Sequence, residues 1–203
     1  TIWKQALKSI FSPGNKVRIP HTKIDINSSA NSEMRCLCVL LVDVSGSMKL
    51  CEDTINTSIK NFMSDLLHGR NGFKEYSKEQ IELAIIQFDS DVKVLRNPSL
   101  VKRGDRLPVL QVRGLNTNTV GAVRKAMSII ENRKIEHKMK GLSYYRPWII
   151  LLTDGNPNPC SQSELQSLLY DVSHSISENK FMLTAIGIGN SVDKEFLSAI
   201  SNN

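Results

Sequence analysis

The feature that most constrains the fold is an almost unbroken apolar run over residues 35–42, which ends directly at Asp43. Strands that are buried on both faces of a parallel sheet carry such continuous runs, whereas strands with one solvated face alternate apolar and polar residues. Apolar residues at helical spacing follow over residues 52–67. The pattern therefore predicts a central strand followed by a helix that packs on the sheet.

The same alternation of strand and helix patterns continues to the end of the chain. We expect further strands at residues 81–88, 92–95, 148–153 and 181–186, and helices that begin near Thr119, Ser161 and Ser191. The short link Asp89-Ser90-Asp91 indicates a hairpin, so the strand after it should be antiparallel at an edge of the sheet. The order of elements predicts an α/β fold with a doubly wound, mostly parallel, Rossmann-like sheet and helices on both faces.

The first part of the chain differs in composition from the rest. Residues 2–10 have the spacing of a short amphipathic helix, and residues 27–32 have the composition of a linker. We therefore divide the chain into an N-terminal arm over residues 1–33 and one domain over residues 34–203. A length of 203 residues suits a single sizeable α/β domain.

Composition argues against several classes of partner. The net charge is +6, but lysine and arginine are scattered and aromatic residues make up only 6%, which favours a solvated surface over a nucleic-acid site. The longest apolar runs have the length of strands, so no membrane span is expected. The four cysteines form no CxxC pair, which indicates free thiols and a cytoplasmic location.

Polar side chains follow two of the predicted strands where each strand ends, and a long loop over residues 96–118 brings more of them. These segments are Asp43-Val44-Ser45-Gly46-Ser47, Asp154-Gly155 and Asn116-Thr117-Asn118-Thr119. In doubly wound sheets, ligands bind beyond the carboxyl ends of the central strands. Carboxylates and hydroxyls without His or Cys suit Mg²⁺ or Mn²⁺ and disfavour zinc. Neutral hydroxyl ligands leave the charge of a cation largely uncancelled, so it still attracts an anionic oxygen.

In order and spacing, these three segments resemble the metal-ion-dependent adhesion site of von Willebrand factor type A domains, over about residues 35–200. The resemblance implies a binding module and not an enzyme. The bound metal of such a module is expected to coordinate an Asp or Glu carboxylate of a partner protein. It also implies hydroxyl ligands and two carboxylates at or near the metal, often acting through water. The implied residues are Ser45, Ser47 and Thr117 for the hydroxyls, and Asp43 and Asp154 for the carboxylates.

The flanking sequence and two departures refine this resemblance. Residues 86–89, 145–155 and 185–189 are similar to the bacterial branch that includes the TerY-like proteins of tellurite resistance. Relatives often carry Gly directly before the ligand Thr, whereas this chain does not, which leaves Thr119 as an alternative to Thr117. We prefer Thr117 because Ala122-Val123 then falls where the family places a pair of small and apolar residues. The family sheet has a sixth strand, and we expect this chain to stop before it.

The same residues leave two other functions open besides metal-dependent binding. A Mg²⁺-dependent enzyme acting on phosphoryl groups would need a base or a cationic clamp, for which only Lys49 and Arg146 are candidates by proximity in sequence. A scaffold domain would use the metal only to hold its own loops in place. Asp89 and Asp91 form another carboxylate pair, but they flank a predicted turn, where Asp is favoured for conformational reasons.

Overall fold

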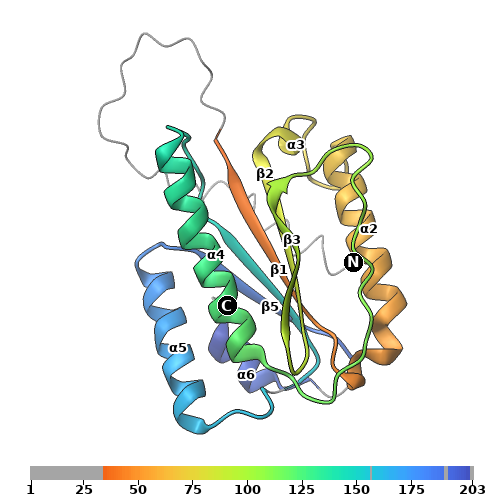
Figure 1. Ribbon diagram of the computed structural model, residues 1–203, viewed down its shortest axis with the longest axis vertical. Coiled ribbons are helices and arrows are strands. Elements are labelled where there is room, and N and C mark those ends of the chain that lie inside the picture. The colour runs from red at the N-terminus through yellow and green to blue at the C-terminus, as the bar shows by residue number, and fades with distance from the viewer. Residues whose placement is uncertain (1–33, 156, 190–191, 202–203) are drawn as a thin grey trace.

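Five strands form one sheet in the order β3-β2-β1-β4-β5 in the computed structural model, which describes residues 34–155, 157–189 and 192–201 (Figure 1). The strands are β1 (Cys36–Asp43), β2 (Ile81–Phe88), β3 (Val92–Leu100), β4 (Trp148–Thr153) and β5 (Met182–Gly187). All neighbouring strands are parallel except β2 and β3, which pair antiparallel at the edge. The predicted α/β class and the antiparallel edge strand are confirmed.

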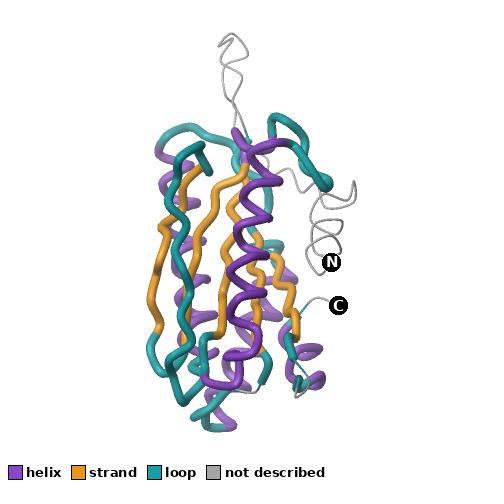
Figure 2. The backbone as a smooth tube through the Cα atoms, turned by 90° about the vertical axis from the view of Figure 1, so that its right-hand side faces the viewer, coloured by secondary structure: helices purple, strands orange, loops and turns teal. Residues whose placement is uncertain are grey.

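Helices cover both faces of the sheet. They are η2 (Gly46–Cys51), α2 (Glu52–His68), α3 (Ser77–Gln80), α4 (Thr119–Met139), α5 (Gln162–Ser177) and α6 (Lys194–Ile200). Helix α2 packs on one face, and α4, α5 and α6 pack on the other, so that the sheet is the middle layer (Figures 1 and 2). In the part of the chain that the structure describes, no helix combines the length and apolar character needed to cross a membrane.

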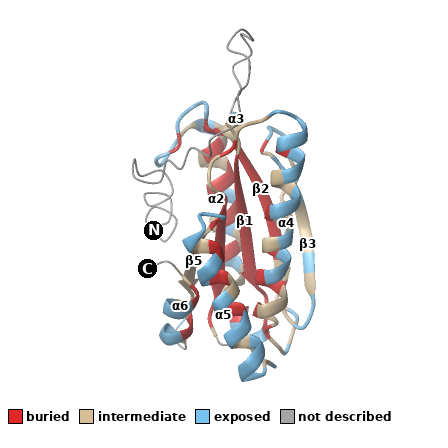
Figure 3. Cartoon of the chain, turned by 90° about the vertical axis from the view of Figure 1, so that its left-hand side faces the viewer, coloured by how far each residue is buried: buried red, intermediate tan, exposed pale blue. Residues whose placement is uncertain are grey.

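Strand β1 is buried along its whole length because both of its faces meet helices (Figure 3). Leu37, Val39 and Leu41 pack toward α4 and α5, whereas Cys36 and Cys38 point together toward the α2 side. Burial raises the pKa of the Cys36 thiol to about 12, so this thiol stays protonated at neutral pH. The continuous apolar run seen in the sequence is thus explained by a central parallel strand.

Some boundaries differ from those that the sequence predicts. Strand β3 was predicted over residues 92–95 but continues to Leu100, because it stays paired with β2 through a register shift opposite Arg96. Pro98 is tolerated there since an edge strand has one side without ladder hydrogen bonds. The predicted long loop therefore begins five residues later, at residue 101. The helix and linker predicted within residues 1–33 lie outside the described residues.

Candidate metal centre

The carboxyl ends of β1 and β4 lie side by side at the lower end of the sheet in Figure 1. The two strands are parallel neighbours, with Val42 opposite Leu152, so the residues that follow each strand leave the sheet together. Asp43 is the last residue of β1, and Asp154 directly follows β4. The topology of the fold therefore brings together two carboxylates that are far apart in the sequence.

Asp43 is completely buried, and protein groups hold both of its oxygens. The backbone N–H of Ser45 donates to Oδ1 at 2.9 Å, and the Thr153 hydroxyl donates to Oδ2 at 2.6 Å. Burial raises the pKa of Asp43, these hydrogen bonds lower it, and the nearby charge of Asp154 raises it further, so that the net direction is upward. Asp43 is thus a carboxyl group held in one orientation, with a second carboxyl group close to it.

Ser45 and Ser47 place two hydroxyl oxygens next to one another at the start of η2. Their Oγ atoms are 3.2 Å apart, with Ser45 buried and Ser47 exposed. Neighbouring ligands of an octahedral Mg²⁺, each at 2.0–2.1 Å from the ion, are about 2.9 Å apart. The spacing of the two hydroxyls therefore fits two adjacent ligand positions of one such ion.

Thr117 reaches the same place through backbone pairing with the loop after β4. The Thr117 N–H donates to the Asn158 carbonyl at 2.6 Å, and the Asn158 N–H donates back to the Thr117 carbonyl at 3.0 Å. On the other side of the loop, the Gly46 N–H donates to the Gly114 carbonyl at 2.8 Å. A Cβ on Gly114 would lie 2.2 Å from the Cβ of Asp89, so the loop can approach the β2–β3 turn only with glycine here.

The long loop before Thr117 is also tied to α2. The Asn56 side chain accepts the Leu110 N–H at 2.9 Å and donates to the Leu110 carbonyl at 3.0 Å. Nearby, the Val112 N–H donates to a Glu52 carboxylate oxygen at 3.2 Å. Helix α2 therefore holds the part of the loop that precedes Thr117.

These segments enclose an open cavity of about 630 Å³. Its lining comprises Ser45, Gly46, Ser47, Gly114, Leu115, Thr117, Asp154, Gly155, Pro157 and Asn158. Four of the five predicted site residues line the cavity. The fifth, Asp43, lies behind the lining and accepts a hydrogen bond from the Ser45 backbone N–H. The alternative ligand Thr119 does not line the cavity; it is fully buried, and its hydroxyl has no hydrogen-bond partner among the described residues.

The sequence interpretation missed the lining residues of two loops. Gly114 and Leu115 precede Thr117, and Pro157 and Asn158 follow Asp154-Gly155. The dense proline and asparagine content of residues 156–159 was a signal for a turn at this point. Nothing local in the sequence shows that this turn pairs with the Thr117 backbone, since the two segments are about 40 residues apart.

The electrostatics of the cavity favour a cation. Across residues 34–155, 157–189 and 192–201, neither Asp43 nor Asp154 takes part in an ion pair, although both are buried. Buried carboxylates are normally paired or coordinate a metal, because an isolated buried charge is costly. The same described residues contain no group of three His, Cys, Asp or Glu side chains placed to bind a metal. The lining therefore offers hydroxyls and the Asp154 carboxylate, while the Asp43 carboxyl group lies behind it, hydrogen-bonded to Ser45.

The candidates for phosphoryl chemistry are engaged elsewhere. Lys49 pairs with Glu52 at 2.7 Å and does not line the cavity. The Arg146 guanidinium donates to the carbonyls of Phe181 and Ile176, and Arg146 precedes β4, at the opposite end of that strand from the site. The Asp91 N–H donates to the Asp89 carboxylate at 2.9 Å, as expected for an aspartate that shapes a turn.

Comparisons with known proteins agree with this architecture. The sequence profile of the von Willebrand factor type A domain matches residues 38–203. A von Willebrand factor type A protein from Catenulispora acidiphila superposes with a TM-score of 0.62 at 18% identity, covering 83% of this chain and 36% of that one. The pilus adhesin SpaC from Lactobacillus rhamnosus GG, in its open conformation, gives 0.59 at 15% identity, with 83% and 27% covered.

A third similar structure comes from an animal. Proximal thread matrix protein 1 of the mussel byssus superposes with a TM-score of 0.54 at 19% identity, covering 84% of this chain and 42% of that one. The chain therefore spans less than half of each of these three proteins, and at such low identity the likeness concerns the fold alone. A search of curated protein sequences gave no significant match.

Proposed function

The chain belongs to the von Willebrand factor type A domain family, whose members generally mediate protein–protein interactions, and we propose that it does so through a bound divalent metal. The metal is Mg²⁺ or Mn²⁺, held at a metal-ion-dependent adhesion site by the hydroxyls of Ser45, Ser47 and Thr117. Asp43 and Asp154 supply negative charge at or near it. The partner protein contributes an Asp or Glu carboxylate to the metal.

The observation that carries this proposal is the convergence of the Ser45 and Ser47 hydroxyls, 3.2 Å apart, beside buried carboxylates that have no cationic partner among the described residues. Because protein donors already occupy both oxygens of Asp43, the neutral hydroxyls are the groups best placed to face a cation directly. A cation held mainly by neutral oxygens remains attractive to an anionic ligand, and the cavity is open to solvent on that side.

The test compares two isosteric variants of the full chain by Mg²⁺ titration calorimetry. Thr117→Val removes a hydroxyl that lines the cavity, whereas Thr119→Val removes a buried hydroxyl outside its lining. We expect the wild-type chain to bind Mg²⁺ at one saturable site, Thr117→Val to lose that binding, and Thr119→Val to keep it. Wild-type-like binding by Thr117→Val, or none by the wild type, would overturn the proposed site.

A binding role is better supported than phosphoryl chemistry. Catalysis would require a positive group or a base at the cavity, and the hydrogen bonds of Lys49 and Arg146 direct both side chains elsewhere. We therefore expect no Mg²⁺-dependent hydrolysis of p-nitrophenyl phosphate. A scaffold role would instead appear as Mg²⁺ that raises stability without changing the binding of any acidic ligand.

We further propose that the chain belongs to the TerY-like bacterial branch and acts in the cytoplasm. The support for this location is that Cys36, Cys38, Cys51 and Cys160 are free thiols in the structure, two of them buried. Cell fractionation followed by immunodetection tests the location, and recovery of the protein from an extracytoplasmic fraction would contradict it.

A further inference from the structure

Two leucines project almost entirely into solvent from the segments that build the cavity. Leu50 is 96% exposed and Leu115 is 94% exposed, and no other large apolar side chain of the described residues is exposed as fully. Single exposed apolar residues are common on protein surfaces, whereas several exposed apolar residues that lie together on one surface are typical of an interaction site.

The geometry of η2 places Leu50 on the same side as a candidate ligand. A 3₁₀-helix has three residues per turn, so side chains three positions apart are eclipsed. Met48 is completely buried and Cys51, three residues later, packs against the same core, which fixes the inward side of η2. Ser47 and Leu50 form another such pair, and both are exposed. Leu50 therefore extends the surface that begins at the Ser47 hydroxyl.

Leu115 approaches the site from the long loop. It lines the cavity itself, and the hydrogen bond from the Gly46 N–H to the carbonyl of Gly114, its neighbour in sequence, ties its loop to the start of η2. Pro157 lines the cavity from the loop after β4. Apolar side chains from three segments thus lie next to the hydroxyls, Leu115 and Pro157 in the lining and Leu50 beyond Ser47, and we name Leu50, Leu115 and Pro157 the apolar rim.

One positive charge lies next to this rim. Arg113, two residues before Leu115, is exposed and hydrogen-bonds the neutral side chain of Gln111. Within the described part of the chain it forms no ion pair, so its charge is available to an acidic ligand. The surface around the cavity therefore offers apolar contact and a positive charge together.

We propose that this surface binds an exposed protein segment in which an Asp or Glu lies directly beside a large apolar residue. The inference rests on the proposed metal-dependent function and specifies its partner. The carboxylate enters the cavity while its apolar neighbour packs on the apolar rim. Exclusion of water by the rim strengthens the polar contact that it surrounds, because electrostatic attraction is greater where the effective dielectric constant is lower.

A library of random peptides displayed on phage provides the test. It is selected in Mg²⁺ on the immobilised full chain, eluted with EDTA, and selected in parallel on the double variant Leu50→Ser/Leu115→Ser. Because both leucines are nearly fully exposed, the double variant should fold and bind Mg²⁺ by calorimetry as the wild type does. The wild type should enrich peptides with an acidic residue next to an apolar one, and a synthetic copy should bind the double variant about tenfold or more weakly.

Each other outcome has a separate meaning. Acidic peptides without an apolar neighbour, or equal affinity for both proteins, would overturn the apolar rim and leave the metal site standing. Peptides that EDTA does not release, or no enrichment at all, would overturn both the partner and the proposed metal-dependent function. A Mg²⁺-dependent dimer in sedimentation that the double variant abolishes would assign the rim to a second copy of the chain and overturn the proposed partner.

Discussion

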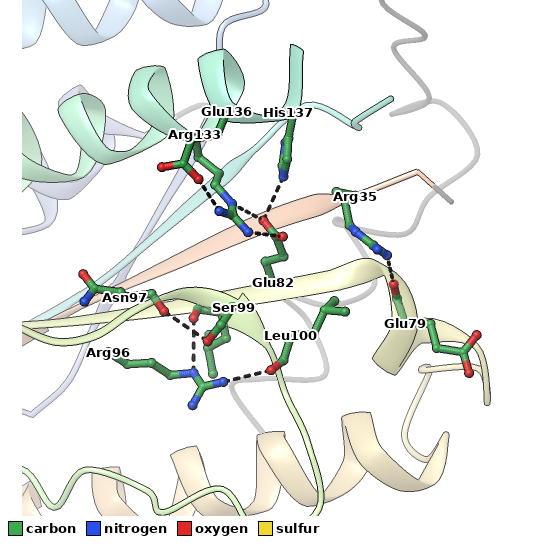
Figure 4. A network of polar contacts seen from close by, with 11 residues as sticks. Arg35, Glu79, Glu82, Arg96, Asn97, Ser99, Leu100, Arg133, Glu136 and His137 are labelled. Atoms are coloured by element: carbon green, nitrogen blue, oxygen red, sulfur yellow. Dashed lines mark hydrogen bonds and ion pairs between the residues drawn. The ribbon is translucent and has the colours of Figure 1, made fainter. Parts of the chain in front are cut away.

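Replacing Glu82 by glutamine should lower the free energy of unfolding by about 3 kcal/mol at neutral pH, although Glu82 lies at the opposite end of β2 from the candidate metal centre. Glu82 is only 3% exposed and accepts two hydrogen bonds from the Arg133 guanidinium, at 2.8 and 2.5 Å. His137, also buried, contacts the same carboxylate at 3.1 Å (Figure 4). The variant leaves the arginine without this buried counter-charge.

The magnitude follows from the proton affinity of the carboxyl group. Burial raises the pKa of Glu82, but hydrogen bonds and charge from Arg133 and His137 outweigh it and lower the pKa from 4.5 to about 2. Because each pKa unit is equivalent to about 1.4 kcal/mol, this lowering of the Glu82 pKa corresponds to about 3 kcal/mol in the free energy of unfolding. Loss of one partner of a buried ion pair typically costs about 3–5 kcal/mol, which agrees.

The sign of the pH dependence is fixed by the same values. Between pH 4.5 and pH 2 the unfolded chain binds more protons at Glu82 than the folded chain does, so stability rises with pH across this window. The contribution of ionised Glu82 to the free energy of unfolding is complete above pH 4.5, falls to roughly 1 kcal/mol at pH 3, and is lost below pH 2. Glu82→Gln should therefore differ from the wild type most at pH 7.

Urea unfolding followed by circular dichroism at pH 7 and pH 3 measures both effects. With an m-value of about 2 kcal/mol per M, the midpoint at pH 7 should fall by about 1.5 M. Glu136→Gln is the matched control, because Glu136 is the other carboxylate that pairs with Arg133 and its side chain is 51% exposed. This variant should lower the free energy of unfolding by less than about 1 kcal/mol. A Glu82→Gln loss no larger than that of the control, or equal losses at both pH values, would refute the reasoning.

Three further predictions concern the framework of the site. Thr119→Val should raise stability by about 1 kcal/mol in urea unfolding, because the buried Thr119 hydroxyl has no hydrogen-bond partner in the part of the chain that the structure describes; a loss of stability would contradict this. Gly114→Ala should cost about 1–3 kcal/mol in urea unfolding and weaken Mg²⁺ binding, because its new Cβ would clash with the Asp89 side chain; Gly155→Ala, whose new Cβ meets no described atom within 4 Å, should keep wild-type stability. Ser161→Ala removes the capping box of α5 and should lower the melting temperature through a loss of about 1 kcal/mol, without changing Mg²⁺ affinity.

The parts of the fold that the sequence predicted well are those set by local pattern. Strand β4 was predicted with its observed bounds because its apolar run is unbroken. The start of α5 was predicted near Ser161, where the structure shows a Ser161–Glu164 capping box with both of its hydrogen bonds. In both cases neighbouring residues alone determine the conformation, so no knowledge of the rest of the chain was needed.

The parts that the sequence did not predict depend on distant contacts. The extension of β3 through Asn97 and Pro98 follows from pairing with β2, which compensates for residues that rarely occur in strands. The sequence placed Thr117 and Thr119 both near the site. Only the pairing of Thr117 with Asn158 shows why one lines the cavity while the other is buried in the first turn of α4.

The most direct test of the proposed function is to locate the metal itself. Crystals of the chain soaked in Mn²⁺, measured at a wavelength where manganese scatters anomalously, would show where the ion binds. We predict one anomalous peak in the cavity, within coordination distance of the hydroxyl oxygens of Ser45, Ser47 and Thr117. No peak there at saturating Mn²⁺, or a peak held by other residues, would contradict the proposal that this domain binds its partner through a metal.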